Sequence, residues 1–265
     1  MTTVSLPPIE RDTVVILVPA CNEAAQIEDT LRSLQGQTRV VDAIIVIANN
    51  CTDNTAELAQ AADARVTTMQ DNDHKKAGAL NYAIGLLLDG PMFPEFIVTI
   101  DADTILDEYF VERAVHLLRY NEKLGGVSAV CRGKSGLGNN PYQRSLAWLQ
   151  SAEYSRAGFT RMRYNIHTLS GAGSALRAEA ILDVIGDRGE LYAQRDNNLV
   201  EDYEATLEIK RHGWECTNNY YCVAYTDMML SLRALLKQRM RWVRGSVNEL
   251  RQRGWQQEPK VSILA

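Results

Sequence analysis

The sequence has few cysteine and histidine residues, and they do not have the spacings of a metal site. Its five cysteines are scattered, odd in number and free of any Cys-x-x-Cys pair, and its four histidines form no pair at helical spacing. Such cysteines are typical of reduced thiols in a cytosolic protein. We therefore expect a cytoplasmic localisation.

Long apolar runs are also absent. No stretch approaches the roughly 18 apolar residues that a membrane-spanning helix needs. The N-terminus is polar and contains Pro7 and Pro8, so it does not resemble a signal peptide. The sequence therefore predicts a soluble protein without a transmembrane segment.

Two nucleotide-binding signatures and an excess of positive charge are missing as well. There is no Gly-x-Gly-x-x-Gly and no Walker lysine loop, which leaves dinucleotide-binding and P-loop folds without support. The net charge of −5 argues against a dedicated nucleic-acid-binding protein. The apolar fraction of 46% and the charged fraction of 23% in 265 residues are those of an ordinary globular protein with a sizeable core.

The most informative stretch of the sequence is IVTIDADTIL. Residues 96–100 form an apolar, β-branched-rich run that predicts a strand buried on both faces, and Asp101 and Asp103 follow it directly. Ligands of open α/β sheets bind at the carboxyl ends of the strands, and two carboxylates there are hard oxygen ligands for Mg²⁺ or Mn²⁺. Solvated turn acids, or a cap for a helix that begins near Glu108, explain the pattern equally well.

The first part of the sequence predicts two βα units. Apolar runs at 13–18 and 44–48 predict strands, the first of which ends at Pro19, and a helical pattern follows each run. A short third strand is expected at 65–69. Short apolar strands that alternate with helices are typical of an α/β fold with a parallel, doubly wound sheet.

A pair of lysines precedes the next predicted helix. Lys75 and Lys76 stand just before Ala77, Gly78 and Ala79, where the helix is expected to begin. Small residues at a helix N-terminus beside a lysine suit a diphosphate. A surface lysine pair before an amphipathic helix is the simpler interpretation of the same residues.

The second half contains a long helix, two polar segments and a basic end. A helix is predicted over 141–163, and the small residues of SGAGSAL at 170–176 indicate either close approach of the backbone to a flat ligand or a tight packing turn. Glu201 and Asp202 crowd the first turn of a helix, where the helix dipole alone favours them. The last helix is rich in arginine and lysine around Trp242, and a solvated face is the default interpretation of such a run.

Taken in order, these stretches resemble the motifs of the inverting glycosyltransferases of family 2, which have the GT-A fold. PACNE resembles the opening turn of the family, CTDNT the end of its second motif, KAGALN its diphosphate segment and DAD its metal motif. SGAGSA resembles the acceptor-side segment, VED the motif that supplies the base, and QRMRW the Gln-x-x-Arg-Trp signature of members that polymerise sugars. The resemblance covers about residues 13–250, with every motif in order.

The resemblance implies a single GT-A domain over 1–265 with two parts. Residues 13–131 would form a nucleotide-sugar-binding half, and 132–255 an acceptor-binding half with the basic helix. The implied reaction is a metal-dependent, inverting transfer of a sugar from a nucleotide sugar, expected to be a UDP-sugar, to an acceptor hydroxyl. A glycan, a lipid-linked group, a protein or a nucleic acid could be the acceptor, and the basic helix could also contact a membrane surface.

The resemblance also implies roles for individual residues. The catalytic residues would be Asp202 as the base, together with Glu201 and Arg241. The nucleotide sugar would contact Pro19, Asn22, Glu23, Asn49, Asp53, Lys76, Gly78, Asp101, Ala102 and Asp103. A Mg²⁺ or Mn²⁺ ion would be held by Asp103, assisted by Asp101. The acceptor would contact Gly171, Ala172, Gly173, Gln238, Arg241 and Trp242.

The sequence departs from the family pattern in three places. Ala48, Asn49 and Asn50 stand where the second motif usually carries acids, Val200 replaces a threonine, and the membrane helices of the polymerising members are absent. The chain is then either a soluble relative that makes limited transfers or the catalytic portion of a longer protein.

Two other functions stay open at this point. A nucleotidyltransferase that makes activated sugars would also use acids and lysines around a metal, but it would ordinarily need a glycine-rich phosphate loop where PACNE stands. A catalytically inactive module that only binds a nucleotide sugar or a partner is disfavoured, because Asp101, Asp103 and Asp202 are intact.

Overall fold

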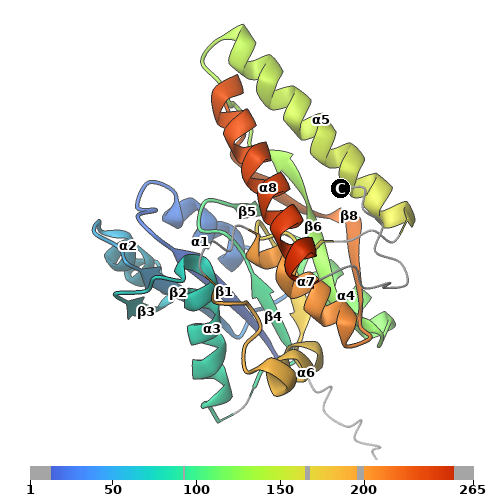
Figure 1. Ribbon diagram of the computed structural model, residues 1–265. Coiled ribbons are helices and arrows are strands. Elements are labelled where there is room, and N and C mark those ends of the chain that lie inside the picture. Colours follow the sequence, from blue (N-terminus) through green and yellow to red (C-terminus); the bar gives the residue numbers. More distant parts are fainter. Residues whose placement is uncertain (1–12, 92, 165–167, 196–199, 254–265) are drawn as a thin grey trace, which may run out of the picture.

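The computed structural model describes residues 13–91, 93–164, 168–195 and 200–253. Within these ranges it contains an eight-stranded sheet with helices on both faces (Figure 1). The strands lie in the order β3-β2-β1-β4-β7-β6-β8-β5 across the sheet. Their bounds are β1 Val14–Ala20, β2 Ala43–Asn49, β3 Arg65–Met69, β4 Phe96–Thr99, β5 Ile105–Leu106, β6 Leu124–Gly133, β7 Ser174–Arg177 and β8 Glu215–Thr226.

Most of the sheet is parallel, as the sequence predicted. Strand β1 pairs in parallel with β2 and β4, and β2 pairs in parallel with β3. In the other half, β6 and β8 are parallel, whereas β7 runs antiparallel to both of its neighbours and β5 runs antiparallel to β8. The predicted α/β class is therefore confirmed, with an antiparallel strand at the junction of the two halves.

Helices cover the sheet from both sides because the buried strands are apolar on both faces. Along β1, Val14, Ile16 and Val18 pack with α1, α2 and α4, whereas Val15 and Leu17 pack on the opposite face with α3. Helices α6 and α7 join α3 on that second face. The helix bounds are α1 Ile27–Gln35, α2 Thr55–Ala61, α3 Lys75–Leu88, α4 Phe110–Tyr120, α5 Pro141–Tyr164, α6 Ala178–Arg188, α7 Glu201–Arg211 and α8 Leu232–Arg253.

Strand β1 continues through Pro19, although the sequence predicted that it ends there. On one side, Pro19 is opposite Ile47 of β2. On the other side, β4 pairs with β1 only as far as Leu17. The missing N–H of the proline therefore costs no ladder hydrogen bond, since a proline is tolerated where one side of a strand is unpaired.

The loops after β1, β2 and β4 meet at one edge of the sheet. These strands are adjacent and parallel, so their carboxyl ends lie together, and Cys51 after β2 contacts the carbonyl of Ala20 at the end of β1 (Sγ to O, 3.4 Å). Thr30 of α1 donates to the carbonyl of Ala102, which fixes the Asp-Ala-Asp turn beside these loops. The fold thus gathers the predicted donor-side motifs at the edge where ligands of such sheets bind.

Helix α3 begins at Lys75, so both lysines belong to its first turn and do not precede it as predicted. Asn72 contacts the residues at this start. Its side-chain oxygen accepts a hydrogen bond from the His74 amide, and its side-chain nitrogen donates to the carbonyl of Lys75.

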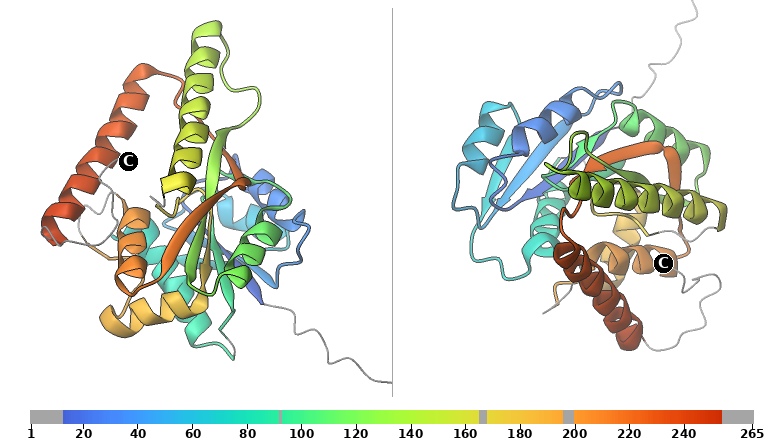
Figure 2. Two further views of the ribbon diagram at one scale, coloured as in Figure 1. Left: turned by 90° about the vertical axis from the view of Figure 1, so that its right-hand side faces the viewer. Right: turned by 90° about the horizontal axis from the view of Figure 1, so that it is seen from above.

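Helices α5 and α8 lie at the periphery of the molecule and extend beyond the end of the sheet (Figures 1 and 2). They are joined by an ion pair between Glu153 and Arg239 (Oε2 to Nη2, 2.6 Å) and by the neighbouring rings of Tyr154 and Trp242. Among the described residues, none of the helices is both long and apolar enough to cross a membrane.

Candidate active site

Lys76 projects from the first turn of α3 into a group of acidic side chains. Its ammonium is bonded to Asp101, lies 3.6 Å from Glu201 and donates to the carbonyl of Gly171 at 3.4 Å. Burial alone would lower the pKa of Lys76, but attraction to Asp101, Glu201 and Asp202 outweighs burial and raises the pKa. Lys76 is therefore a permanent positive charge at the end of β4.

Asp202, on the first turn of α7, faces the same point from the other side. Its two carboxylate oxygens accept hydrogen bonds from the amides of Gly171 (3.1 Å) and Tyr203 (2.8 Å). Burial and repulsion from Glu201 raise the pKa of Asp202, although Lys76 and the two amide donors act in the opposite direction. A half-buried carboxylate whose pKa is raised in this way is a stronger base than an aspartate in water.

Gly171 joins the two sides of the site, since its carbonyl accepts from Lys76 and its amide donates to Asp202. A Cβ atom at this position would lie 2.5 Å from Lys76 Nζ and 3.5–3.6 Å from the carboxylates of Asp101 and Asp202. A side chain at this position would therefore displace the Lys76 ammonium from its present place beside the Gly171 carbonyl. The small-residue segment is therefore in contact with both motifs that the resemblance assigns to chemistry.

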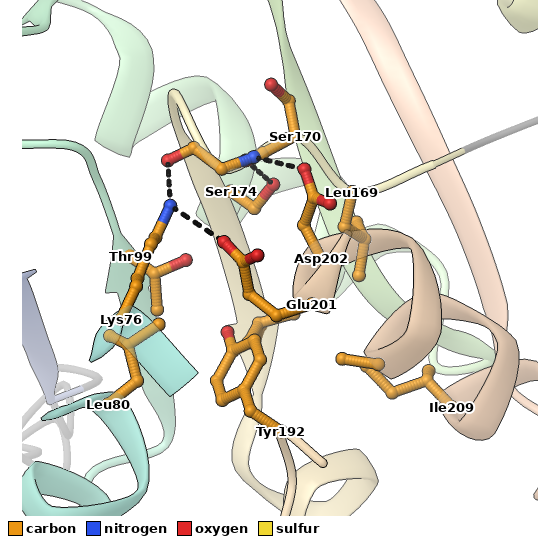
Figure 3. Close-up of a pocket in the computed structure, with 13 residues that line it drawn as sticks. Lys76, Leu80, Thr99, Leu169, Ser170, Ser174, Tyr192, Glu201, Asp202 and Ile209 are labelled. Atoms are coloured by element: carbon orange, nitrogen blue, oxygen red, sulfur yellow. Dashed lines mark hydrogen bonds and ion pairs between the residues drawn. The ribbon is translucent and has the colours of Figure 1, made fainter. Parts of the chain in front are cut away.

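These residues line a pocket between α3, β4, β7 and α7 (Figure 3). Polar groups of Lys76, Glu201 and Asp202 line it together with the apolar side chains of Leu80, Leu169, Leu176 and Ile209. The enclosed cavity measures about 20 Å³, which is room for about one water molecule. A sugar or nucleotide would therefore lie over the mouth of this pocket and would not fit inside it.

Tyr192 lies in the same pocket, and sequence reasoning did not identify it. Burial raises its pKa to about 12, although a hydrogen bond to Thr99 and attraction to Lys76 oppose the effect, so the phenol stays protonated. Asn81 fixes the residue, because its amide group donates to the Tyr192 carbonyl at 2.6 Å and accepts from the Tyr192 amide at 3.0 Å. Tyr192 belongs to an irregular loop, so no periodic pattern could mark it.

Helix α7 is anchored by buried polar contacts. Glu204, with no exposed surface, is bonded to Arg188 and accepts from the amide of Ala193. The Thr206 hydroxyl donates to the carbonyl of Asp202 (2.6 Å) and accepts from the amide of Leu169 (3.0 Å). Because buried and fully paired groups hold one geometry, these contacts fix the position of the Asp202 carboxylate.

A second group of acids lies across the sheet edge from Lys76. Burial raises the pKa of Glu23, and repulsion from Asp103, Asp101 and Asp53 raises it further, whereas Lys134 lowers it. Burial is also the main cause that raises the pKa of Asp101. The negative charge at this edge is therefore only partly neutralised by the side chains around it.

Two carboxylates at this edge fit a divalent cation. Among the described residues, no group of three or more His, Cys, Asp and Glu side chains could hold a metal ion on its own. Mg²⁺-type hard cations, however, are commonly bound by one or two carboxylates plus the phosphates of a substrate. Asp103 is the better placed ligand, because the Asp101 carboxylate is engaged by Lys76.

The asparagines of the first two motifs connect loops. Asn49 is buried, and its side-chain oxygen accepts from Asn72 at 2.8 Å. The side-chain oxygen of Asn22 accepts from the amide of Thr52 at 2.7 Å. Asn22 has a positive φ of 58°, a conformation that asparagine tolerates better than most residues. Both side-chain carbonyls are thus engaged within the protein.

Asp53 also ties neighbouring loops together. One of its carboxylate oxygens accepts from the amide of Ala24 at 3.2 Å, and the other accepts from the hydroxyl and amide of Thr55. The hydrogen bond from the Thr55 hydroxyl is the main reason why the pKa of Asp53 is lowered. Thr55 in turn accepts from the amide of Glu23 at 2.9 Å, so the first two loops are connected twice.

The backbone amides of Gly78, Ala172 and Gly173 form hydrogen bonds with nearby residues of the chain. The Gly78 amide donates to the carbonyl of His74 within α3, and a Cβ at Gly78 would lie 2.3 Å from Asn72. The amides of Ala172 and Gly173 both donate to Ser170, one to its hydroxyl and one to its carbonyl. These bonds shape the loops around Lys76 and Gly171.

The three residues of the Gln-x-x-Arg-Trp motif lie on α8, outside the lining of the pocket. Trp242 is half-buried, and its ring stacks with the guanidinium of Arg239, whose carbon lies 4.5 Å from the ring centre. Gln238 has a buried side-chain oxygen without a hydrogen-bond partner in the described structure. Arg241 is exposed. The structure therefore unites the predicted donor and base residues, but does not bring Arg241 to them.

The model of the family described as "Glycosyltransferase like family 2" matches residues 11–245. Among curated proteins, the chain is 26% identical over 248 residues to a poly-beta-1,6-N-acetyl-D-glucosamine synthase of Staphylococcus aureus. The match covers 89% of this chain but 55% of the synthase. The chain thus spans about half the length of this relative.

Solved structures show the same fold. A mannosyltransferase from Pyrobaculum calidifontis, in complex with GDP-Man and Mn²⁺, aligns with a TM-score of 0.70 at 20% identity, over 97% of this chain and 68% of that one. A glucosyl-3-phosphoglycerate synthase from Mycobacterium tuberculosis, in complex with Mn²⁺, UDP and phosphoglyceric acid, aligns with a TM-score of 0.58 at 20% identity, over 90% and 78%.

Proposed function

The chain belongs to the family 2-like glycosyltransferases, and from this premise we propose that it transfers a sugar from a UDP-sugar to an acceptor hydroxyl with inversion. The observation that carries the proposal is the position of Gly171. Its carbonyl contacts Lys76 and its amide contacts Asp202, so a phosphate-binding cation and a base would act on one bound substrate.

The ammonium of Lys76 would bind the departing diphosphate and neutralise part of its negative charge. In the described structure its ammonium is bonded to Asp101, and a diphosphate above the pocket would compete with that carboxylate for the same donor. Charge-assisted hydrogen bonds to phosphate are among the strong ones in proteins. The proposal therefore includes a change of partners at Lys76 when the donor binds.

Asp103 and Asp101 would hold a Mg²⁺ or Mn²⁺ ion, which when bound would neutralise part of the charge on the diphosphate. The acids at this edge, whose negative charge is only partly neutralised, support the proposal. The complexes of the two fold relatives also contain Mn²⁺ with a nucleotide.

Asp202 would act as the general base. Each of its oxygens accepts one backbone amide, and a carboxylate oxygen has two lone pairs, so a further hydrogen bond from an acceptor hydroxyl is available. Its raised pKa suits proton removal, and general-base catalysis contributes roughly 10²–10⁴ in rate. Attack by the activated hydroxyl opposite the leaving group would invert the anomeric carbon.

Gln238, Arg241 and Trp242 would contact the acceptor or the diphosphate. Because Arg241 is exposed on α8 in the described structure, this role requires α8 to approach the mouth of the pocket once substrates are bound. Closure of elements around bound substrates is a common step in enzyme cycles.

A second candidate is the catalytic part of a polysaccharide synthase. It is favoured by the match to the staphylococcal poly-beta-1,6-N-acetyl-D-glucosamine synthase and by the share of that protein, 55%, that the match covers. The proposed chemistry is the same, and the two candidates differ in whether transfers repeat on one acceptor.

A donor panel tests the proposal. The protein is incubated with Mn²⁺, a set of UDP- and GDP-sugars and short glycan acceptors, and the released nucleotide is identified by chromatography. We expect UDP to be released, and Asp202→Asn to abolish the release. Formation of pyrophosphate from a sugar phosphate and a nucleoside triphosphate would instead indicate a nucleotidyltransferase and contradict the proposal.

A further inference from the structure

Lys134 follows the carboxyl end of β6 and is held in place by three contacts. Its backbone amide donates to the carbonyl of Thr226 at 3.1 Å, which keeps the loop after β6 beside the end of β8. Its ammonium donates to the side-chain oxygen of Gln26 at 2.7 Å and lies 3.2 Å from a carboxylate oxygen of Asp227. Since the Lys134 side chain is only 18% exposed, its charge is fixed at the meeting point of β6, β8 and the turn before α1.

Asp227 lies at the same end of the sheet as Asp103 because of the pairing between β5 and β8. These strands are antiparallel, with Ile105 opposite Tyr225. In such a register the residues after Tyr225 run alongside the residues before Ile105, which brings Asp227 level with Asp103. The ion pair with Asp227 therefore places the Lys134 ammonium at the level of the Asp-Ala-Asp turn.

Gln26 connects Lys134 to the acids on the other side of that turn. The amide of Gln26 donates to the carbonyl of Glu23 at 3.0 Å, in the turn that leads into α1. Burial and repulsion from neighbouring carboxylates, Asp103 foremost, raise the pKa of Glu23, whereas Lys134 lowers it. The acids concerned, which we call the acidic edge, are Glu23, Asp101 and Asp103. Two lysines thus flank the acidic edge, Lys76 from α3 and Lys134 from the loop after β6.

We propose that Lys134 is a second positioning cation for the donor diphosphate, and that it exchanges Asp227 for phosphate oxygens when the donor binds. This inference rests on the proposed function, because it assumes a nucleotide-sugar donor. In the described structure each of the two lysines is paired with an aspartate. A lysine ammonium is a compact point charge, so one lysine does not match the charge of two phosphoryl groups. Charge-assisted hydrogen bonds to phosphate are strong enough to replace an ion pair that is partly open to solvent.

A purely structural ion pair is the alternative role for Lys134 and Asp227. The Asp227 side chain is 38% exposed, and ion pairs open to solvent contribute little to folding. The two roles also predict opposite signs. If Asp227 competes with the diphosphate for Lys134, its removal strengthens donor binding, whereas removal of Lys134 weakens it. If the pair only holds the loops together, the loss of either residue weakens donor binding.

Calorimetry of UDP and UMP binding to the intact chain, in Mn²⁺, tests these signs. Lys134→Met should weaken UDP binding by about tenfold, the scale of one charge-assisted hydrogen bond, and UMP binding much less. Asp227→Asn is nearly isosteric and should strengthen UDP binding by about threefold, the scale of an exposed ion pair. In the double variant this gain should vanish, because no lysine is left to be released. A gain that persists beside Lys134→Met would come from the charge of Asp227 alone and would overturn the proposal.

Lys123→Met is the matched control, because Lys123 is exposed and precedes β6 at the opposite end of the same strand. It removes the same charge and should leave UDP affinity unchanged. Circular dichroism checks the folding of each variant, and Lys134→Gln replaces Lys134→Met if the latter does not fold. A wild type that binds no UDP would contradict the proposed function together with this inference. If the wild type binds UDP, unchanged affinity in Lys134→Met, weaker binding in Asp227→Asn, equal losses for UMP and UDP, or an equal loss in Lys123→Met would overturn this inference alone.

Discussion

The pocket at the end of β4 and helix α8 both carry charged residues of family motifs, but the two regions are built in opposite ways. In the pocket, every charge is engaged: Lys76 with Asp101, and Asp202 with two backbone amides. On α8, by contrast, Lys237, Arg241 and Arg244 are exposed to solvent. Interlocked charges indicate a preorganised site, whereas exposed charges are ordered only when a substrate or partner contacts them.

This difference separates two kinds of prediction. Substitutions in the pocket should change chemistry directly, because the fold already brings the pocket residues together. Substitutions on α8 should act only in states in which α8 contacts a bound substrate. Five substitutions with matched controls test this division between the pocket and α8.

Asp202→Asn should have the largest effect. The amide is nearly isosteric but cannot accept the proton of an acceptor hydroxyl at neutral pH, so we expect kcat to fall by roughly 10²–10⁴. Donor affinity should stay within a few-fold, because Asp202 is not proposed to contact the nucleotide. Steady-state kinetics together with UDP calorimetry measures both, and a variant that retains activity would direct attention to Glu201 as the base.

Arg241→Ala should lower kcat by an amount equal to roughly 2–4 kcal/mol of transition-state stabilisation, by analogy with other preorganised donors. UDP affinity of the free protein should not change, since Arg241 lies outside the pocket in the described structure. Arg233→Ala on the same helix is the control and should leave kcat unchanged. If the two substitutions behave alike, the proposed approach of α8 to the pocket is wrong.

Gly171→Ala should reduce kcat by about 10-fold to 100-fold, because the added methyl group would lie 2.5 Å from Lys76 Nζ and displace the lysine. Gly186→Ala on α6 is the matched control. A Cβ there meets no atom within 4 Å, so it should leave activity intact and stabilise the helix by roughly 0.5–1 kcal/mol. Thermal unfolding separates the two outcomes, and equal activity of both variants would contradict the role given to Gly171.

Glu201→Gln should produce a shift of the pH profile. Asp202 acts as a base only when ionised, so turnover falls as the pH drops through its raised pKa. Removing the negative charge of Glu201 removes one cause of that raised pKa, and the acid limb should move to lower pH. Lys76→Met should move it to higher pH, because Lys76 lowers the pKa of Asp202. If both substitutions shifted the acid limb of the pH–activity profile in the same direction, that limb would not reflect the titration of Asp202.

Much of the site was predictable because its residues lie near the carboxyl ends of predicted strands. Asp101 directly follows the buried strand β4, Lys76 and Asp202 lie in the first turns of α3 and α7, and the carboxyl ends of parallel strands meet at one edge. The same reasoning did not predict that the side-chain oxygen of Asn49 accepts a hydrogen bond from Asn72. Side-chain partners across loops depend on distances that a linear pattern does not contain.

Tyr192 and the orientation of α8 show the same limit. Tyr192 reaches the pocket because Asn81 holds its backbone, a contact between residues more than one hundred positions apart in the chain. Apolar residues recur along α8 at helical intervals, and such periodicity normally predicts that they are buried. In the structure Leu236 and Val243 are exposed, and it is Arg239 and Glu249 of the same helix that contact the rest of the protein.

The proposed mechanism requires the acidic edge to bind the donor diphosphate through a divalent cation held by Asp103. Isothermal calorimetry of UDP binding, in Mn²⁺ and in EDTA, tests this requirement when wild type and Asp103→Ala are compared. We predict tight binding only for the wild type with Mn²⁺, and equally weak binding in the other three samples. Equal affinity of the wild type in Mn²⁺ and EDTA, or an unchanged response to Mn²⁺ in Asp103→Ala, would contradict the account.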